Sequence, residues 1–231
     1  MGRLVATLFL FTPRVFFVLE QGWTEPFAVL LLAAAIFCAC RWSRALPIAF
    51  GLLLAIKQTM VFTILALPLL LHRRRYRDRP SRVLGLSGAV ALSVSLPLAA
   101  WDIAAFVHST ITLQFHQPFR ADALAYTAWL AHGNVPPSWL AFVVVIPAAA
   151  LALWRSPRTP AGFAAAIAII FFCFFAFNKQ AFCNYYFFVL GALCCAVAAT
   201  GSGCSQSLSE TTPRRFLWRK DTREYHGGMS E

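Results

Sequence analysis

Charged residues are scarce in this chain of 231 residues, and acidic residues are the scarcest. Asp and Glu total 9, Lys and Arg total 20, and all charged residues make up only 13% of the chain. So little charge cannot cover a water-facing surface, and the hydrophobic share of 59% exceeds the roughly 45–50% typical of soluble domains. The composition therefore excludes an ordinary soluble domain and predicts a multi-pass integral membrane protein of the all-α class, with the lipid bilayer as its surroundings.

The sequence also argues against nucleic-acid binding and against a metal site built from cysteine and histidine. The net charge of +11 would suggest nucleic acid in a soluble protein, but the basic residues here lie in short runs between apolar segments. Such runs are typical of loops that stay on the cytoplasmic side of a membrane, so we expect no nucleic-acid partner. The seven cysteines and five histidines show no metal-ligand spacing.

Apolar runs divide the chain into predicted helices. They cover residues 4–19, 26–40, 45–71, 83–101, 139–154, 162–177 and 185–200. A helix needs about 20 mostly apolar residues to cross a bilayer, and shorter ones can be accommodated inside a bundle. We expect a transmembrane bundle of about six to eight helical segments over 1–200, an external loop over 102–138, and a disordered cytoplasmic tail over 201–231.

The basic residues predict which ends of these helices face the cytoplasm. Arg41 and Arg44, the run over 72–82, Arg155 and Arg158, and the tail are all assigned to the cytoplasmic side. Residues 45–71 then start and finish on the same side, which predicts a short re-entrant hairpin with Lys57 and Gln58 at its tip. The alternative is a single long tilted helix.

Under the hairpin interpretation, the remaining polar residues gather on the extracytoplasmic side. Charged groups near membrane depth cost several kcal/mol unless they are paired or hydrated, so such a cluster is a functional hypothesis. Each cluster also has an ordinary interpretation, as a helix cap, a snorkelling lysine or interfacial residues. The candidates are Gln21, Glu25, Lys57, Gln58, Asn178, Lys179, Gln180, Asn184 and Tyr185.

The external loop is predicted to contain structure of its own. Apolar residues from Ile103 to Leu113 recur at helical spacing, which indicates a helix lying along the membrane interface, and residues 121–131 predict a second short helix. Arg120, between them, could bind a phosphate through two hydrogen bonds. The loop histidines, His108, His116 and His132, are interpreted as interfacial residues rather than metal ligands.

Three motifs in this order resemble the GT-C superfamily of polytopic glycosyltransferases. They are Gln21-Gly22-Trp23-Thr24-Glu25, the run Gly51 to Gln58, and Phe177-Asn178-Lys179-Gln180-Ala181-Phe182-Cys183-Asn184-Tyr185-Tyr186. The last is similar to a stretch of the mannosyltransferases that add the first mannose of GPI anchors, with Asn184 where that family has Gln. In the first motif, Gln21 stands where the family has Arg.

The resemblance implies transfer of a sugar from a polyprenyl-phosphate carrier to an acceptor at the extracytoplasmic face. Lys57, Arg120 and Lys179 would neutralise the phosphate leaving group, and a carboxylate would deprotonate the acceptor. Glu25 is the first candidate for that carboxylate, with Asp102 and Asp122 as the others. No cofactor is certain, and a divalent cation stays open because enzymes of this family use the carboxylate as a base or as a metal-linked acid.

The chain departs from the family because no aspartate precedes the apolar run that begins at Pro26. We expect the chain to be the C-terminal part of such an enzyme; the alternatives are a different base or an inactive chain. Two other functions stay open: a lipid or solute transporter, which also uses broken helices and midplane charges, and a non-catalytic membrane subunit.

Overall fold

The computed structural model describes residues 2–71, 80–131, 137 and 139–201, and every regular element in these ranges is a helix. The prediction of an all-α fold is confirmed. The predicted tail over 201–231, apart from Gly201, and His132 lie outside the described residues. In chain order the elements are α1 (Gly2–Leu10), α2 (Val15–Glu20), α3 (Glu25–Cys40), α4 (Leu46–Ile56), η1 (Gln58–Phe62), α5 (Thr63–Leu71), α6 (Pro80–Trp101), α7 (Ile103–Val107), η2 (His108–Thr112), α8 (Leu113–His116), α9 (Tyr126–Leu130), α10 (Leu140–Arg155), α11 (Pro160–Ala176) and α12 (Cys183–Gly201).

Most of the predicted helices are present with bounds shifted by a few residues. Within the run 4–19, a break at Pro13 and Arg14 separates α1 from α2, and Arg14 itself has a left-handed backbone with φ of 69°. The predicted second helix of the external loop is shorter than expected, because α9 starts only at Tyr126. Instead of continuing a helix, the backbone amides of Arg120 and Leu124 bind carbonyls of Lys179 and Ala181.

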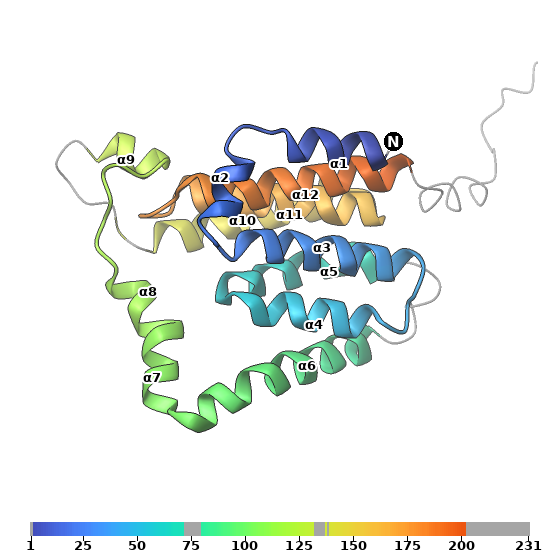
Figure 1. Ribbon diagram of the computed structural model, residues 1–231, viewed down its shortest axis with the longest axis horizontal. Coiled ribbons are helices and arrows are strands. Elements are labelled where there is room, and N and C mark those ends of the chain that lie inside the picture. Colours follow the sequence, from blue (N-terminus) through green and yellow to red (C-terminus); the bar gives the residue numbers. More distant parts are fainter. Residues whose placement is uncertain (1, 72–79, 132–136, 138, 202–231) are drawn as a thin grey trace, which may run out of the picture.

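The long helices of the bundle run side by side, and α7 to α8 lie across one end of it (Figure 1). The core is made by α11, whose buried face includes Phe163, Ile167 and Phe171, with α12, α10, α3 and α5 around it. Its aromatic rings interlock, as in the contact between Phe171 and Phe188 with ring centres 4.8 Å apart. The segment from α7 to α8, residues 103–116, was predicted to lie along an interface. It runs across the direction of the long helices (Figure 1).

Residues 46–71 form a hairpin, not one long helix. The chain reverses direction between α4 and α5 (Figure 1). The reversal is local: Lys57 has an extended backbone, with φ −159° and ψ 138°, and a 3₁₀ turn follows it. At about 1.5 Å per residue, the 11 residues of α4 are only about 17 Å long.

Small residues bring neighbouring helices into close contact. A Cβ atom on Gly51 of α4 would lie 2.6 Å from the Ser87 carbonyl oxygen of α6, and one on Gly191 of α12 would lie 2.6 Å from Val29 of α3. Close backbone approach at small residues is how helices associate in membranes. In contrast, Gly85 on the outer face of α6 has open space around it.

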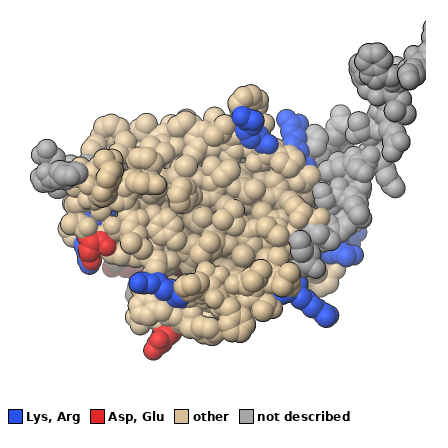
Figure 2. Space-filling model, turned by 90° about the horizontal axis from the view of Figure 1, so that it is seen from above, with Lys and Arg blue, Asp and Glu red and all other residues tan. Residues whose placement is uncertain are grey.

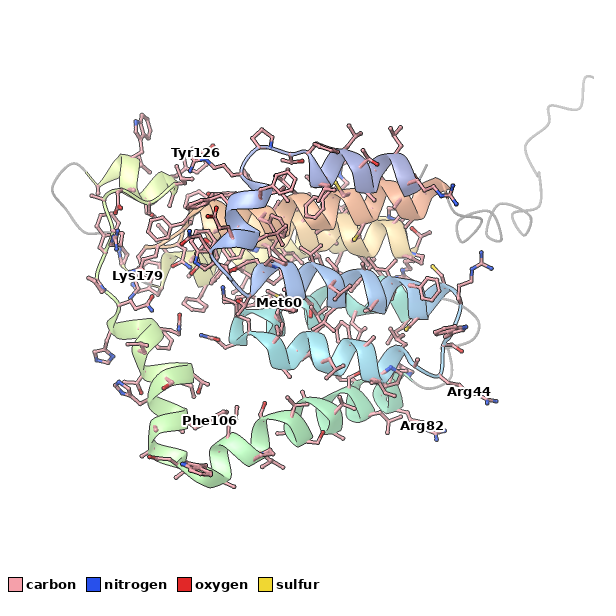
Figure 3. The ribbon with its side chains drawn as sticks, viewed as in Figure 1. Arg44, Met60, Arg82, Phe106, Tyr126 and Lys179 are labelled. Atoms are coloured by element: carbon pink, nitrogen blue, oxygen red, sulfur yellow. The ribbon has the colours of Figure 1, made fainter. Side chains whose placement is uncertain are left out.

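The charged residues separate toward the two ends of the bundle. Arg44 and Arg82 are labelled at one end and Lys179 at the other (Figure 3). Arg41 and Arg155, at the C-terminal ends of α3 and α10, lie at the same end as Arg44 and Arg82, which we call the basic end. We call the opposite end the cavity end, after the cavity described below. Figure 2 shows few charged side chains across the middle of the visible face.

Two described helices are long and apolar enough to cross a membrane. They are Pro80–Trp101 and Cys183–Thr200, and five apolar helices of 10–17 residues accompany them. Large apolar side chains point outward around the bundle, including Leu98, Trp101 and Ile146, whose exposed fractions are 66%, 92% and 70%. So many large apolar side chains exposed around one bundle are unusual for a soluble monomer and indicate contact with a membrane or a partner.

Candidate functional site

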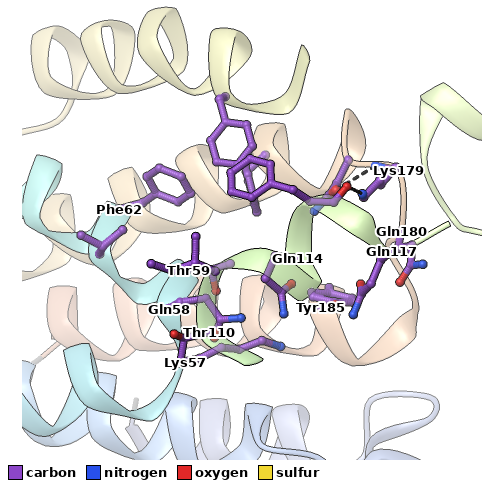
Figure 4. Close-up of a pocket in the computed structure, with 16 residues that line it drawn as sticks. Lys57, Gln58, Thr59, Phe62, Thr110, Gln114, Gln117, Lys179, Gln180 and Tyr185 are labelled. Carbon is purple, nitrogen blue, oxygen red and sulfur yellow. Dashed lines mark hydrogen bonds between the residues drawn. The ribbon is translucent and has the colours of Figure 1, made fainter. Parts of the chain in front are cut away.

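A cavity of about 220 Å³ lies at the cavity end of the bundle (Figure 4). The tip of the α4–α5 hairpin, the helix 103–116, the start of α10 and the loop between α11 and α12 all contribute to it. Its polar lining residues are Lys57, Gln58, Thr59, Thr110, Gln114, Gln117, Asn178, Lys179, Gln180 and Tyr185. Its apolar lining residues are Val61, Phe62, Ile111, Phe115, Phe142 and Phe174.

Lys57 joins this cavity to a buried carboxylate. Its ammonium nitrogen lies 2.5 Å from Oε1 of Glu25 and 4.5 Å from the centre of the Tyr185 ring. The Glu25 side chain is 3% exposed and the Lys57 side chain 20% exposed. A carboxylate this buried requires a partner, so the ion pair holds both charges in place, and the ring face adds a cation–π contact.

The local backbone explains why these two charges meet. Glu25 occupies the first turn of α3, just before Pro26, where a negative charge is favoured by the helix dipole. The extended backbone at Lys57 ends α4 and turns its side chain away from the helix, while its carbonyl accepts a hydrogen bond from the Met60 amide at 2.9 Å. Glu25 thus starts α3 while its side chain pairs with the hairpin tip.

Lys179 and Gln180 reach the cavity from the loop between α11 and α12. The Lys179 ammonium donates to the Phe115 carbonyl at 2.8 Å, and the Gln180 amide donates to the Pro118 carbonyl at 2.7 Å. A cation beside the last carbonyls of the helix 103–116 also complements its dipole. Burial lowers the pKa of the Lys179 ammonium below its ordinary value.

Arg120 and Asp122 pair with each other at the surface, outside the cavity lining. The guanidinium donates to both carboxylate oxygens, from Nε at 2.9 Å and from Nη2 at 2.8 Å, and it lies 5.4 Å from the centre of the Phe182 ring. The hydrogen bonds from Arg120 lower the pKa of the Asp122 carboxyl below its ordinary value. Both side chains are at least half exposed.

The other predicted site residues lie apart from the cavity lining. Asp102 caps α7, where its Oδ1 accepts from the Ala105 amide at 2.9 Å, and it is exposed. Gln21 is exposed after α2, where its backbone amide binds the Phe17 carbonyl. Asn184, in the first turn of α12, has a buried Oδ1 with no hydrogen-bond partner among the described residues. The structure thus brings together Lys57, Gln58, Asn178, Lys179, Gln180 and Tyr185, with Glu25 behind Lys57.

The sequence interpretation missed four polar residues of the lining, namely Thr59, Thr110, Gln114 and Gln117. Thr110 and Gln114 lie four residues apart, and this spacing places them on one face of a helix. This polar pair, inside the mostly apolar pattern of residues 103–114, could have indicated a polar face on the helix. Its meaning depended on which neighbour that face would contact, and this is set by the hairpin tip far away in the sequence.

The lining combines cations and amide groups on one part of the wall with phenylalanine rings on another. Phe115 and Phe142 stack with ring centres 6.0 Å apart, and Phe62 lies 4.9 Å from Phe174. Such a wall suits a ligand with an anionic, hydrogen-bonding head and an apolar tail. The described residues contain no group of three or more His, Cys, Asp and Glu side chains that could hold a metal ion.

Comparisons of this chain with protein families, with curated proteins and with solved structures found no match.

Proposed function

We propose that this protein is a multi-pass membrane glycosyltransferase of the GT-C type, which binds a polyprenyl-phosphate-linked sugar in the cavity. The observation that supports this most directly is the composition of that one cavity: Lys57 and Lys179, amide groups from both sides, and an aromatic wall. A phosphate would be neutralised by the two ammonium groups. Sugar hydroxyls would bond to the amides, and the polyprenyl chain would contact the rings of Phe62, Phe142 and Phe174.

A multi-pass arrangement is supported by the segregation of charge. With the basic end in the cytoplasm, α6 and α12 span the bilayer and the shorter helices pack among them, while the hairpin enters and leaves on the cytoplasmic side. Cysteine labelling tests this orientation: a reagent that cannot cross the membrane labels Ser109→Cys from outside and Ser81→Cys from inside. Labelling of Ser109→Cys from the cytoplasmic side alone contradicts the orientation.

In the proposed transfer, the bond between the sugar anomeric carbon and the phosphate oxygen breaks, and a bond to the acceptor oxygen forms. The phosphate leaves with the electron pair and is stabilised by Lys57 and Lys179. The acceptor proton passes to a carboxylate, and Glu25 is the candidate because, within the described residues, it alone among carboxylates is hydrogen-bonded to a lining side chain. No step in this proposal involves a metal ion.

The distribution of polar groups favours an enzyme over a transporter. A transport path would line both halves of the bundle with polar groups. In the described part of the chain, the buried polar or charged side chains are Glu25, Thr63, Ser87 and Thr127, while the interior of α11 is made of alanine, isoleucine and phenylalanine. A site confined to the cavity end supports chemistry at one face of the membrane.

The test is a transfer assay on the purified chain in lipid nanodiscs, with polyprenyl-phosphate-mannose labelled in the sugar and a membrane lipid extract as acceptor. We expect label to leave the donor, and Lys57→Ala or Lys179→Ala to abolish this. Arg155→Ala is the matched control, because it removes a positive charge from the basic end. Loss of activity confined to the two lysine variants supports the proposal. Vectorial movement of the lipid across vesicles without any transfer contradicts it.

A further inference from the structure

Thr127 is buried on a helix whose other side chains are largely exposed. Its exposed fraction is 2%, whereas its neighbours Tyr126 and Trp129 on α9 are 54% and 73% exposed. It does not line the cavity. A buried hydroxyl requires a hydrogen-bond partner, and the partner of this one lies 51 residues away in the sequence.

That partner is the main chain of the loop that carries the cavity residues. The Thr127 hydroxyl donates to the Asn178 carbonyl at 2.6 Å. The loop between α11 and α12 is not helical, so its carbonyls need donors from elsewhere. The amide of Arg120 donates to the Lys179 carbonyl at 3.3 Å, and the amide of Leu124 donates to the Ala181 carbonyl at 2.6 Å.

These three hydrogen bonds hold the loop through donor residues that do not line the cavity. On the cavity side, the Asn178 side chain accepts from the Lys179 amide at 2.8 Å, so the orientation of one residue is tied to that of the next. Asn178 and Lys179 both line the cavity. Fixing the Asn178 carbonyl therefore constrains the backbone from which the Asn178 amide and the Lys179 side chain reach the cavity.

We infer that Thr127 is a positioning residue, whose hydroxyl sets the loop so that Asn178 and Lys179 meet the phosphate head of the bound lipid. This inference rests on the proposed function, since it requires the cavity to bind a phosphate. It depends on the hydroxyl and not on the shape of the side chain. Valine has the same shape but leaves the Asn178 carbonyl without this donor, whereas serine keeps the donor and loses one methyl group.

The experiment compares the wild type, Thr127→Val and Thr127→Ser in nanodiscs titrated with a polyprenyl monophosphate, together with hydrogen–deuterium exchange of residues 177–182. We expect the valine variant to bind about tenfold more weakly and its loop amides to exchange faster. The serine variant should stay within about twofold of the wild type. Thr159→Val controls for a general loss of stability, because the Thr159 hydroxyl caps α11 at the basic end, accepting from the Gly162 amide at 3.0 Å.

The outcomes separate the two claims. Weaker binding and faster loop exchange in Thr127→Val alone support the positioning role. Wild-type affinity in Thr127→Val, or equal weakening in Thr159→Val, overturns it while leaving the proposed function intact. A wild-type protein that binds no polyprenyl phosphate overturns both, and in that case the exchange data still report whether Thr127 orders the loop.

Discussion

Lys57 and Glu25, 32 residues apart in the sequence, form an ion pair in which the ammonium nitrogen lies 2.5 Å from Oε1. This pair connects the start of α3 to the tip of the α4–α5 hairpin, so it links the position of a cavity cation to the packing of the bundle. Because Glu25 is buried, the pair has consequences for stability as well as for ligand binding.

Removing one member of this pair should destabilise the protein more than removing both. Lys57→Met leaves a buried carboxylate without its partner, and Glu25→Gln leaves the ammonium without its counter-charge; each should lower the free energy of unfolding by about 2 kcal/mol or more. The double variant should recover part of that loss but should not recover phosphate binding. Thermal unfolding in detergent micelles measures the coupling. Strictly additive losses would show that the two residues do not stabilise each other.

Gly51 is packed against a neighbouring helix, whereas Gly85 on that neighbouring helix is exposed. Alanine substitutions at these two positions therefore form a matched pair. Gly51→Ala places a Cβ 2.6 Å from the Ser87 carbonyl and 2.7 Å from Val90, so α4 and α6 must move apart at a cost of about 1–3 kcal/mol. Gly85→Ala meets no atom within 4 Å and should be neutral or slightly stabilising, because alanine favours helix. Equal effects on the melting temperature would contradict the close packing of α4 on α6.

Affinity for a phosphate should depend on pH through Lys179. Burial lowers its pKa below the ordinary lysine value of 10.5, because the charged form is disfavoured. Anion binding should therefore weaken as pH rises through this lowered pKa, earlier than an ordinary lysine would allow. Lys179→Arg should remove the part of this weakening that comes from residue 179, since arginine stays charged, while Lys57 is unchanged. Inorganic phosphate titrations from neutral to alkaline pH measure this, and identical profiles for the wild type and the arginine variant contradict it.

The lowered pKa of Lys179 affects folding stability in the opposite direction to ligand affinity. Between the folded and the unfolded pKa of Lys179, the unfolded chain binds more protons than the folded one, so the contribution of Lys179 to folding stability becomes more favourable as pH rises through that window. Ligand affinity and stability should therefore move in opposite directions with pH, which distinguishes a direct effect on binding from a general loss of structure.

The sequence was sufficient to predict the helices, because each is an apolar run bounded by proline, glycine or charge. Pro26 and Arg41 bracket α3 within a residue, and the basic residues predicted that Arg44 and Arg82 would share one end. The hairpin was favoured from the same charges. These features depend on local composition and on the positions of the basic residues along the chain, both of which are readable from one sequence.

The partners of the site residues were not predictable in the same way. Nothing in the neighbourhood of Glu25 indicates that its partner is Lys57. Arg120 was expected to bind a phosphate, but its Nε and Nη2 donate to the two carboxylate oxygens of Asp122, two residues on. The start of α9 was misplaced because the amide of Leu124 binds the main chain of Ala181. The partner of Glu25 and the start of α9 depend on contacts between segments distant in the sequence, whereas the pairing of Arg120 with Asp122 is local.

The central claim is that one cavity binds the phosphate head of a polyprenyl lipid through Lys57 and Lys179. Its most direct test is equilibrium binding of a polyprenyl monophosphate to the wild type, Lys57→Met and Lys179→Met in nanodiscs, with helix content checked by circular dichroism. We predict saturable binding by the wild type and a loss of at least about tenfold in affinity for each folded variant. The claim is contradicted if the wild type shows no saturable binding, or if both variants bind as tightly as the wild type.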